Sequence, residues 1–205
     1  VSVQQFPLEP DDSFAAFAAR FTAATDAAVE AGSRVVVFPE LVTTSLLAAH
    51  PDREQLTVKD LNRVYREHFP TFTDDVIALV RDLARTRNIV VIGGSHLRRV
   101  DDQIRNTAHI AFPDGQFVRQ DKLHLTPAER AMGVEPGETV EIFDVEGMPS
   151  AVQICADIEF PEVSRILAHR GVETIFAPSL TWNTRGSERV RIGAHARAME
   201  NQVFV

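Results

Sequence analysis

The one cysteine of the chain, Cys155, has the type and the position of a nucleophile. It follows the largely apolar run 151–154, where an expected strand gives way to a loop and then to a helix. Functional groups in such sheets gather at the carboxyl ends of strands, so a thiol at this junction is a candidate catalytic residue. Nearby helix-terminal amides could stabilise its thiolate. The alternative is a buried core thiol, because free cysteine is among the most buried residue types.

Glu40 and Lys122 could supply the proton carrier and the positive charge that such a thiol needs. Glu40 follows the apolar run 35–38 and Pro39. A carboxylate near apolar walls has a raised pKa, which suits a base that must later act as an acid. Lys122 lies within an expected strand, and an inward-pointing ammonium there would stabilise negative charge on a substrate oxygen. A solvated loop acid and a solvated strand face are the respective alternatives.

The elements that must position these residues follow from the hydrophobic pattern. A helix begins after the N-cap candidates Asp11, Asp12 and Ser13, carries apolar residues at helical spacing from Phe14 to Ala28, and is closed by Gly32. Further helices are expected over residues 57–69, 74–87, 161–170 and 187–200. Strands are expected over residues 35–38, 89–92, 107–112, 117–125, 140–145, 151–155, 174–177 and 202–205.

Turn residues refine this pattern. The pair Gly93-Gly94 is expected to end the strand over residues 89–92. Residues 113–115, Pro-Asp-Gly, predict a hairpin that joins the strands on either side of them. Residues 126–139 are polar and are expected to form a long loop. The order of elements is mixed, because some strands alternate with helices and others form hairpins.

Bulk composition limits the possible functions. The chain has 205 residues, of which 44% are hydrophobic and 24% charged, as expected for one globular domain over residues 1–205. A formal net charge of −8 disfavours a nucleic-acid surface, and no apolar run approaches the roughly 20 residues that cross a bilayer. A lone cysteine excludes an internal disulfide and paired-cysteine zinc sites. These features predict a soluble, cytoplasmic protein that binds neither nucleic acid nor membrane.

The candidate residues lie in segments that resemble those of a known family. Residues 37–41, 122–129 and 154–162 resemble, in the same order, the three signature segments of the nitrilase (carbon–nitrogen hydrolase) superfamily. Residues 177–179 and 196–201 agree as well, so the resemblance spans essentially the whole chain. It implies an α/β fold, a four-layer αββα sandwich with the site at the strand ends. The family has closing strands beyond its last helix here, so the sandwich is expected to be truncated at its C-terminal end.

The resemblance also implies roles for individual residues. Glu40 would be the general base, Lys122 the cation that stabilises the oxyanion and Cys155 the nucleophile. Glu129 would correspond to a second glutamate that orients the substrate and Lys122, although Glu135 and Glu138 lie in the same expected loop. No metal and no organic cofactor is implied. Relatives usually pair through their helices, so a homodimer or a higher homo-oligomer is expected. Phenylalanine-rich helix faces are compatible with it, with core burial as the alternative.

Three positions suggest what the pocket accepts. Ala156 stands where many relatives carry an aromatic residue, so the pocket wall beside the nucleophile is expected to be open. The backbone N–H of Ala156 is expected to be a second donor to the oxyanion. Glu159 stands where many carry arginine, which would favour a cationic or neutral substrate, with a surface ion pair as the alternative. Trp182 is expected to line the pocket, with core packing as the alternative.

The expected function is hydrolysis of a non-peptide C–N bond, with a small-molecule amide or nitrile as substrate and amidase as the commonest outcome. Nitrilase, ureido-hydrolase and N-acyltransferase activities on the same site remain open, as does a catalytically silent scaffold or binding protein. An isochorismatase-like hydrolase is disfavoured, because it has an early aspartate and a doubly wound sheet. A papain-like enzyme is disfavoured because Cys155 ends a strand instead of opening a helix.

Overall fold

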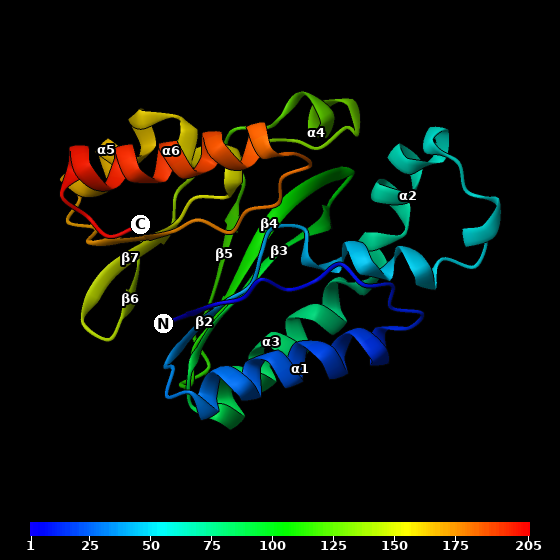
Figure 1. Cartoon of the computed structure of the whole chain (residues 1–205), viewed down its shortest axis with the longest axis horizontal. Helices are drawn as coiled ribbons and strands as arrows, with labels where there is room; N and C mark the ends of the chain where they lie inside the picture. Colours follow the sequence, from blue (N-terminus) through cyan, green and yellow to red (C-terminus); the bar gives the residue numbers. More distant parts are fainter.

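The structure, a computed structural model, describes residues 1–205 (Figure 1). Its helices are α1 (Phe14–Glu30), α2 (Leu61–Glu67), α3 (Thr73–Arg87), α4 (Pro127–Ala131), α5 (Pro161–His169) and α6 (Thr184–Asn201). Its strands are β1 (Ser2–Val3), β2 (Val35–Val37), β3 (Val90–Val100), β4 (Gln103–Ala111), β5 (Phe117–Asp121), β6 (Phe143–Val145), β7 (Met148–Val152) and β8 (Thr174–Phe176). Short 3-10 helices cover Val42–Ala49, Arg53–Gln55, Val58–Asp60, Phe69–Phe72 and Cys155–Glu159, of which the last is called η5.

The strands form two sheets. The first has five strands in the order β1-β2-β3-β4-β5, in which β1, β2 and β3 run parallel and the β3-β4-β5 part is antiparallel. The second has the order β6-β7-β8, with a hairpin between β6 and β7 and a parallel pair β7-β8. The parallel pairs place the carboxyl ends of β2 and β3, and of β7 and β8, at common edges. Glu40 and Cys155 follow β2 and β7 at such edges.

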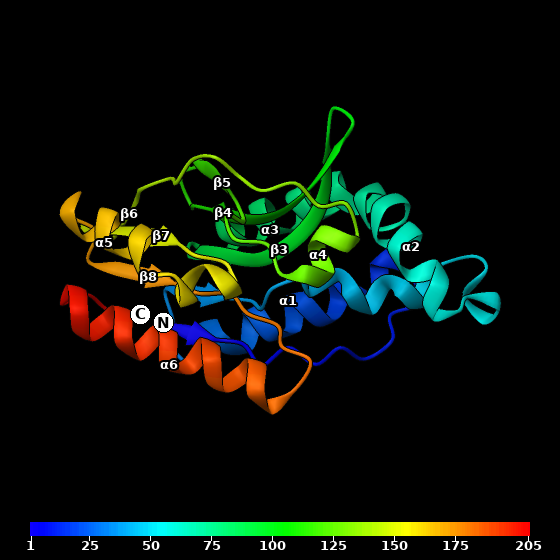
Figure 2. The ribbon, with the colours of Figure 1, turned by 90° about the horizontal axis from the view of Figure 1, so that it is seen from above.

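The sheets and helices stack in four layers, as predicted. Helices α1 and α3 cover one side of the molecule and α5 and α6 the opposite side, with both sheets between them (Figures 1 and 2). Strand β2 is apolar at every position because both of its faces are buried. Val36 packs in the core under α1 and α3, whereas Val35 and Val37 pack in the core between the sheets. A strand buried on both faces has no polar side to alternate with.

The phenylalanine-rich face of α1 lies in the core. Phe17 and Phe21 are buried, and Phe21 stacks on Phe38 with a ring-centroid distance of 3.6 Å. This face is therefore occupied within the chain, which removes it as support for pairing with a second copy. Ser13 caps α1 by accepting a hydrogen bond from the Ala16 amide, as the sequence indicates. None of the helices combines the length and the apolar character that crossing a membrane requires.

Several predicted boundaries were wrong. Strand β3 continues through Gly93-Gly94 to Val100, with an irregularity in its pairing between Ile92 and Ser95. The expected strand over residues 117–125 ends at Asp121, because the amides of Leu123 and His124 donate to the Asp157 carboxylate and not to a neighbouring strand. The expected strands over 140–145 and 151–155 are β6 and β7, so Cys155 lies three residues beyond β7. The expected loop over residues 126–139 contains α4. The helix expected over residues 57–69 is shorter in the structure, where it is α2, and the helix expected over residues 187–200 is longer, where it is α6.

Gly94 lets β3 approach the segment that carries Glu40. Its φ is +71°, and an added Cβ would lie 2.0 Å from the Pro39 carbonyl oxygen. The next residue, Ser95, donates its amide to that oxygen (3.2 Å) and accepts the Leu41 amide on its hydroxyl (3.0 Å). The glycine that the sequence indicates as a strand end is thus a close approach that fixes the backbone on both sides of Glu40.

Gly94→Ala is expected to destabilise the protein more than a backbone penalty alone. Gly115 offers a matched control, because its φ is +93° and a Cβ there would meet nothing within 4 Å. Both variants force an alanine into the left-handed region at about 1–2 kcal/mol. The clash with Pro39 should add about 1–3 kcal/mol for Gly94→Ala, measured by urea unfolding. Equal losses in the two variants would contradict this reading of Gly94.

Candidate functional site

Glu40 is far in the chain from Lys122 and Glu129, yet the three side chains form one buried ion cluster. The Lys122 Nζ atom lies 2.7 Å from Glu40 Oε1 and 2.7 Å from Glu129 Oε2. All three side chains are buried, and Lys122 is only 1% exposed. The inward orientation of Lys122 follows from its place just past β5, where its amide donates to the Asn106 carbonyl at 2.8 Å. The solvated-face alternative for Lys122 and the solvated-loop alternative for Glu40 are therefore excluded.

Asn106, on β4, completes the cluster. Its Nδ2 donates to Glu40 Oε1 (3.1 Å) and to Glu129 Oε1 (2.8 Å), so the amide and the ammonium each bridge the two carboxylates. Its Oδ1 is buried and has no hydrogen-bond partner. The sequence does not point to Asn106, because a lone asparagine just before the expected strand over residues 107–112 has no distinctive pattern. Pairing of β4 with β5 carries it to the site, and that register is not visible in the sequence.

Cys155 opens η5 in a left-handed backbone conformation, with φ of +48°. A non-glycine residue rarely adopts this conformation, and such strain is concentrated at functional sites. The thiol contacts the Leu180 carbonyl, at an Sγ–O distance of 3.6 Å, while the Leu180 amide donates to Glu40 Oε2 at 3.0 Å. The backbone of one residue, Leu180, therefore contacts both the thiol and the carboxylate that could take its proton.

The environment shifts the pKa values of these groups apart. Burial, followed by the charge of Glu40, raises the pKa of the Cys155 thiol to about 12. Burial also raises the pKa of Glu40, more than the nearby Lys122 lowers it. For Glu129 burial acts in the same direction, but the charge and hydrogen bond of Lys122 and the bonds from Thr126 and Asn106 outweigh it, so its pKa is lowered. Burial opposes the charge of Lys122, yet the two glutamates hold its pKa above the ordinary value.

These pKa shifts determine the protonation state of each group and thus the role that it can take. At neutral pH Lys122 is charged, Glu129 is ionised and the Cys155 thiol keeps its proton. Such a thiol needs a base to become a nucleophile. Glu40 lies beside it and has the raised pKa of a carboxyl that can both accept and return a proton.

Asp157, which sequence reasoning left without a role, ties the nucleophile segment to the lysine segment. Its buried carboxylate accepts the backbone amides of Leu123 (3.1 Å), His124 (2.6 Å) and Ile154 (2.9 Å), and lies 3.1 Å from His124 Nδ1. The residues on either side of Cys155 and those after Lys122 are thereby held to one side chain. The sequence signal was the position of Asp157, two residues after the cysteine.

Asp157→Ala is expected to destabilise the fold by about 3 kcal/mol or more, because each buried donor left without a partner costs about 1–3 kcal/mol. Asp144→Ala is the matched control, since that exposed carboxylate accepts the single backbone amide of Gly147. Urea unfolding of both variants measures the difference. If both variants lose the same small amount, Asp157 does not hold the two segments together.

The other residues singled out from the sequence lie differently. Ala156 is buried next to Cys155 in η5. Glu159 is held by Arg189 of α6, whose Nε donates at 2.9 Å, so the ion-pair alternative describes it. Trp182 is 73% exposed, which agrees neither with core packing nor with the wall of an enclosed pocket. Neither Glu159 nor Trp182 joins the cluster around Lys122.

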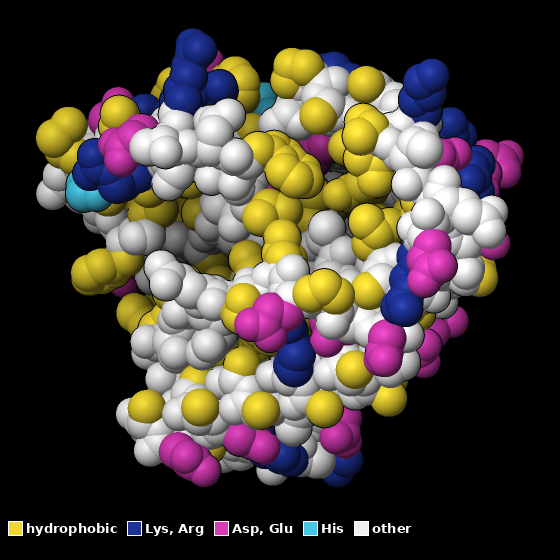
Figure 3. All heavy atoms as spheres, turned by 45° about the vertical axis from the view of Figure 1, so that its right-hand side comes forward, with side chains coloured by type: hydrophobic (Ala, Val, Ile, Leu, Met, Phe, Trp, Pro, Cys, Tyr) yellow, Lys and Arg dark blue, Asp and Glu magenta, His cyan; other side chains and the backbone are white.

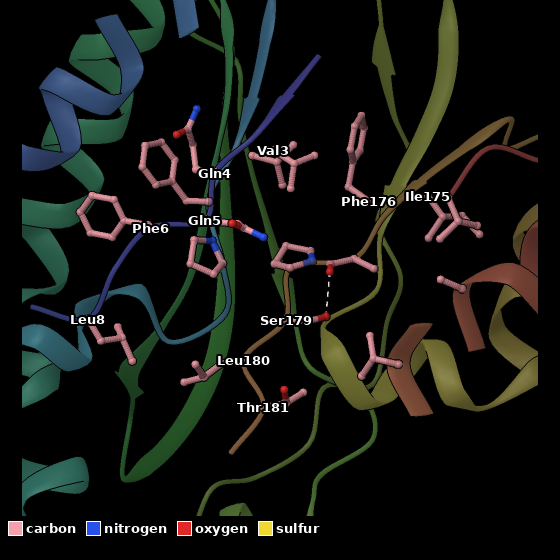
Figure 4. A pocket seen from close by; sticks show the side chains of 18 residues that line it. Val3, Gln4, Gln5, Phe6, Leu8, Ile175, Phe176, Ser179, Leu180 and Thr181 are labelled. Carbon is pink, nitrogen blue, oxygen red and sulfur yellow. Dashed lines mark hydrogen bonds between the residues drawn. The ribbon is translucent and has the colours of Figure 1, made fainter. Parts of the chain in front are cut away.

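A cavity of about 590 Å³ lies beside the cluster, on the other side of residues 178–180. Its walls are mostly apolar and come from residues 3–8, residues 37–39, residues 175–181, α6 and Val205 (Figure 4). Leu180 and Pro39 line this cavity and also neighbour the buried cluster. The cavity wall does not include the reactive residues Glu40, Lys122, Glu129 and Cys155. The cavity thus borders the candidate site without containing its reactive groups.

Comparison with known proteins identifies the family. The model of the carbon–nitrogen hydrolase family matches residues 2–205. The chain belongs to the carbon–nitrogen hydrolase family. Its resemblance to the nitrilase superfamily is thereby confirmed.

Relatives within this family share its sequence to different degrees. YhcX of Bacillus subtilis, described as a probable hydrolase, is 38% identical over 206 residues, which cover 100% of this chain and 39% of YhcX. The ω-amidase NIT2-A of Xenopus laevis is 28% identical over 151 residues, 67% of this chain and 55% of that protein. The chain therefore spans 39% and 55% of the lengths of these two relatives.

Solved structures in the same superfamily share the fold. An amidase from Nesterenkonia sp. AN1, solved with acrylamide added to its active-site cysteine, superposes with a TM-score of 0.77 at 23% identity, covering 98% of this chain and 74% of that one. Nit3 of Saccharomyces cerevisiae gives a TM-score of 0.77 at 24% identity, over 98% and 71% of the two chains. At these identities the likeness concerns the carbon–nitrogen hydrolase fold alone.

Proposed function

We propose that the protein hydrolyses the C–N bond of a small amide through a Cys155 acyl-enzyme and releases ammonia or an amine. The observation that carries this proposal is the bridge made by Leu180: its amide donates to Glu40 and its carbonyl contacts the Cys155 thiol, while Glu40 is also paired with Lys122. A nucleophile, a proton carrier and a cation thus share one buried site. These are the parts that acyl transfer from an amide requires.

In the first half of the reaction Glu40 takes the thiol proton as Cys155 attacks the amide carbon. The C–S bond forms, and the carbonyl electrons move onto oxygen. The Lys122 ammonium and the Ala156 backbone N–H stabilise that oxyanion. As the tetrahedral intermediate collapses, the C–N bond breaks and protonated Glu40 gives its proton to the leaving nitrogen, which departs as ammonia or an amine.

In the second half Glu40 takes a proton from water as the water oxygen attacks the thioester carbon. The C–S bond breaks, the thiolate regains the proton from Glu40, and the carboxylic acid leaves. Glu129 stays ionised throughout and holds Lys122 in place. The site residues proposed for catalysis are therefore Glu40, Lys122 and Cys155, with Glu129 as the orienting carboxylate and no metal or organic cofactor in any step.

The relatives support an amide as the substrate. The match to an ω-amidase and the fold shared with an amidase point to a carboxamide nitrogen as the leaving group. The small side chain of Ala156 beside the nucleophile favours room for the acyl group. On the face seen in Figure 3 hydrophobic side chains surround a hollow in which an acidic side chain is visible.

Ammonia release over a panel of primary amides, ω-amides, carbamoyl compounds and nitriles tests the proposal, with Cys155→Ala as blank. Cys155-dependent ammonia from the amides is expected. Ammonia from nitriles or carbamoyl compounds alone would replace the amidase with a nitrilase or a ureido-hydrolase. No ammonia together with a reactive thiol would indicate N-acyl transfer or a secondary amide. No ammonia together with an inert thiol would indicate a silent scaffold.

Two further features of the proposal concern the surroundings of the enzyme. A homo-oligomer is supported by the exposed apolar side chains Ile166 on α5 and Ile192 and Met199 on α6, which share the side of the molecule away from α1. Sedimentation equilibrium reports the mass directly, and a monomer at micromolar concentration would overturn this feature. A cytoplasmic location is supported by the use of the only cysteine as a free thiol.

A further inference from the structure

The buried cluster contains one carboxylate more than its cation can neutralise. Lys122 carries one positive charge, whereas Glu40 and Glu129 together can carry two negative charges, and the Cys155 thiol beside Glu40 is neutral when protonated. These four are the titratable groups that face one another in the site. Two carboxylates beside a single cation favour the uptake of a proton by one of them. Under the proposed function that proton, which comes from the thiol or from water during the reaction, must go to Glu40.

The donors shared by the two carboxylates do not determine which of them takes the proton. Lys122 Nζ lies 2.7 Å from an oxygen of each, and Asn106 Nδ2 donates to both, at 3.1 Å for Glu40 and 2.8 Å for Glu129. The Lys122 ammonium and the Asn106 amide therefore stabilise the ionised forms of Glu40 and Glu129 to a similar degree. Any strong preference must come from donors that only one of the two receives.

Thr126 supplies that difference. Its backbone amide and its hydroxyl each donate to Glu129 Oε2 at 2.9 Å, so Glu129 accepts four hydrogen bonds in all. Beyond the shared donors, Glu40 receives the Leu180 amide at 3.0 Å and a hydrogen bond from the Cys155 thiol, whose proton is the one transferred in the reaction. Hydrogen bonds to the charged form favour that form, so the two bonds from Thr126 favour ionised Glu129.

We propose that Thr126 is a positioning residue whose hydroxyl keeps Glu129 ionised as the fixed partner of Lys122 and so leaves Glu40 as the carboxylate that carries the reaction's proton. This inference rests on the proposed function. A proton on Glu129 would leave the charged Glu40 as the main partner of Lys122. Glu40 would then be held in an ion pair and less able to take the Cys155 proton.

The same hydroxyl also caps α4, since it accepts the Glu129 amide at 3.3 Å. A test must therefore separate the loss of a helix cap from the loss of the bond to the carboxylate. Thr57 makes the same capping arrangement with Asp60 on the surface, where its amide and hydroxyl donate to Asp60 Oδ2 at 2.9 and 2.8 Å. Thr57→Val removes an equivalent cap outside the site.

The experiment compares the pH dependence of kcat/KM for wild type, Thr126→Val, Thr126→Ser and Thr57→Val. Without the Thr126 hydroxyl the pKa of Glu129 rises, and the pair of carboxyls then takes up its first proton at higher pH. The acid limb of Thr126→Val is expected to move up by about half a pH unit or more, because a hydrogen bond to a charged acceptor corresponds to about 1–2 pK units. Thr126→Ser should restore the wild-type limb, and Thr57→Val should not move it.

An acid limb of Thr126→Val that coincides with wild type overturns the inference, as does an equal shift in Thr57→Val. Alkylation of Cys155 by iodoacetamide follows the same proton without any substrate, because the rate depends on transfer of the thiol proton to Glu40. If wild type hydrolyses amides and neither profile shifts, the inference alone fails. If wild type hydrolyses nothing, the proposed function fails, and the alkylation profiles still decide whether Thr126 assigns the proton.

Discussion

Amide turnover is expected to fall by on the order of 10⁴-fold or more in Cys155→Ala, because loss of the nucleophile removes the covalent route altogether. The fold should survive, since alanine fills most of the small buried space of the thiol and readily occupies the second core between the sheets, where Cys155 packs. Ammonia release measures the activity, and circular dichroism with urea unfolding measures the fold. The chain has no other cysteine that could take over.

Cys155→Ser is the control that separates geometry from reactivity. The serine keeps a nucleophilic oxygen in the same left-handed turn beside Leu180, but a hydroxyl is far harder to deprotonate than a thiol. Its turnover should be strongly reduced while its stability remains close to wild type. Activity of Cys155→Ala near the wild-type value would remove Cys155 from the mechanism, and the acyl-enzyme with it.

Lys122→Met is expected to cost both stability and activity. The unbranched apolar side chain of methionine fills most of the space, but it leaves the carboxylates of Glu40 and Glu129 buried without their cation. Breaking a buried ion pair in this way costs about 3–5 kcal/mol. Loss of the oxyanion partner should lower kcat by about 10²–10³-fold. Urea unfolding and ammonia release measure the two effects, and Lys59→Met is the matched control, because Lys59 is exposed.

The instability of Lys122→Met should depend on pH in a defined direction. Without the cation, the folded-state pKa values of Glu40 and Glu129 rise above their unfolded values. A group with a raised folded pKa favours folding below its unfolded pKa and loses that contribution as pH rises through the folded pKa. The deficit relative to wild type should therefore be largest at neutral pH and shrink on acidification. A deficit that is equal at all pH values would show that lost packing, and not uncompensated charge, is responsible.

Much of the fold could be predicted because its cause is local. The run Val35–Val37 is apolar at every position because β2 has a core on both faces, and that is visible in the sequence. The place of Glu40 and Cys155 after such runs follows from the same pattern. Bounds were predicted less well where a local signal has a tertiary use. Gly94 resembles a strand end, but it is the point where β3 passes close to Pro39.

The site could be predicted only where residue type and segment were distinctive. Cys155, Glu40 and Lys122 were found through three segments that resemble a family's signatures. Asn106 was missed, because its role depends on the pairing of β4 with β5 and on the two carboxylates that this pairing brings within reach. Trp182 was expected in the pocket because its segment follows residues 178–179, whereas its exposure depends on the path of the chain from β8 to α6.

Mass spectrometry of the protein, quenched in acid during turnover of a small amide, tests the covalent mechanism. A Cys155 acyl-enzyme requires a mass increase equal to the acyl group on the peptide that contains Cys155, and no increase in Cys155→Ala. A single cysteine makes the assignment of a thioester unambiguous. Amide hydrolysis at the full rate with no acyl group on Cys155 at any time point would contradict the covalent mechanism.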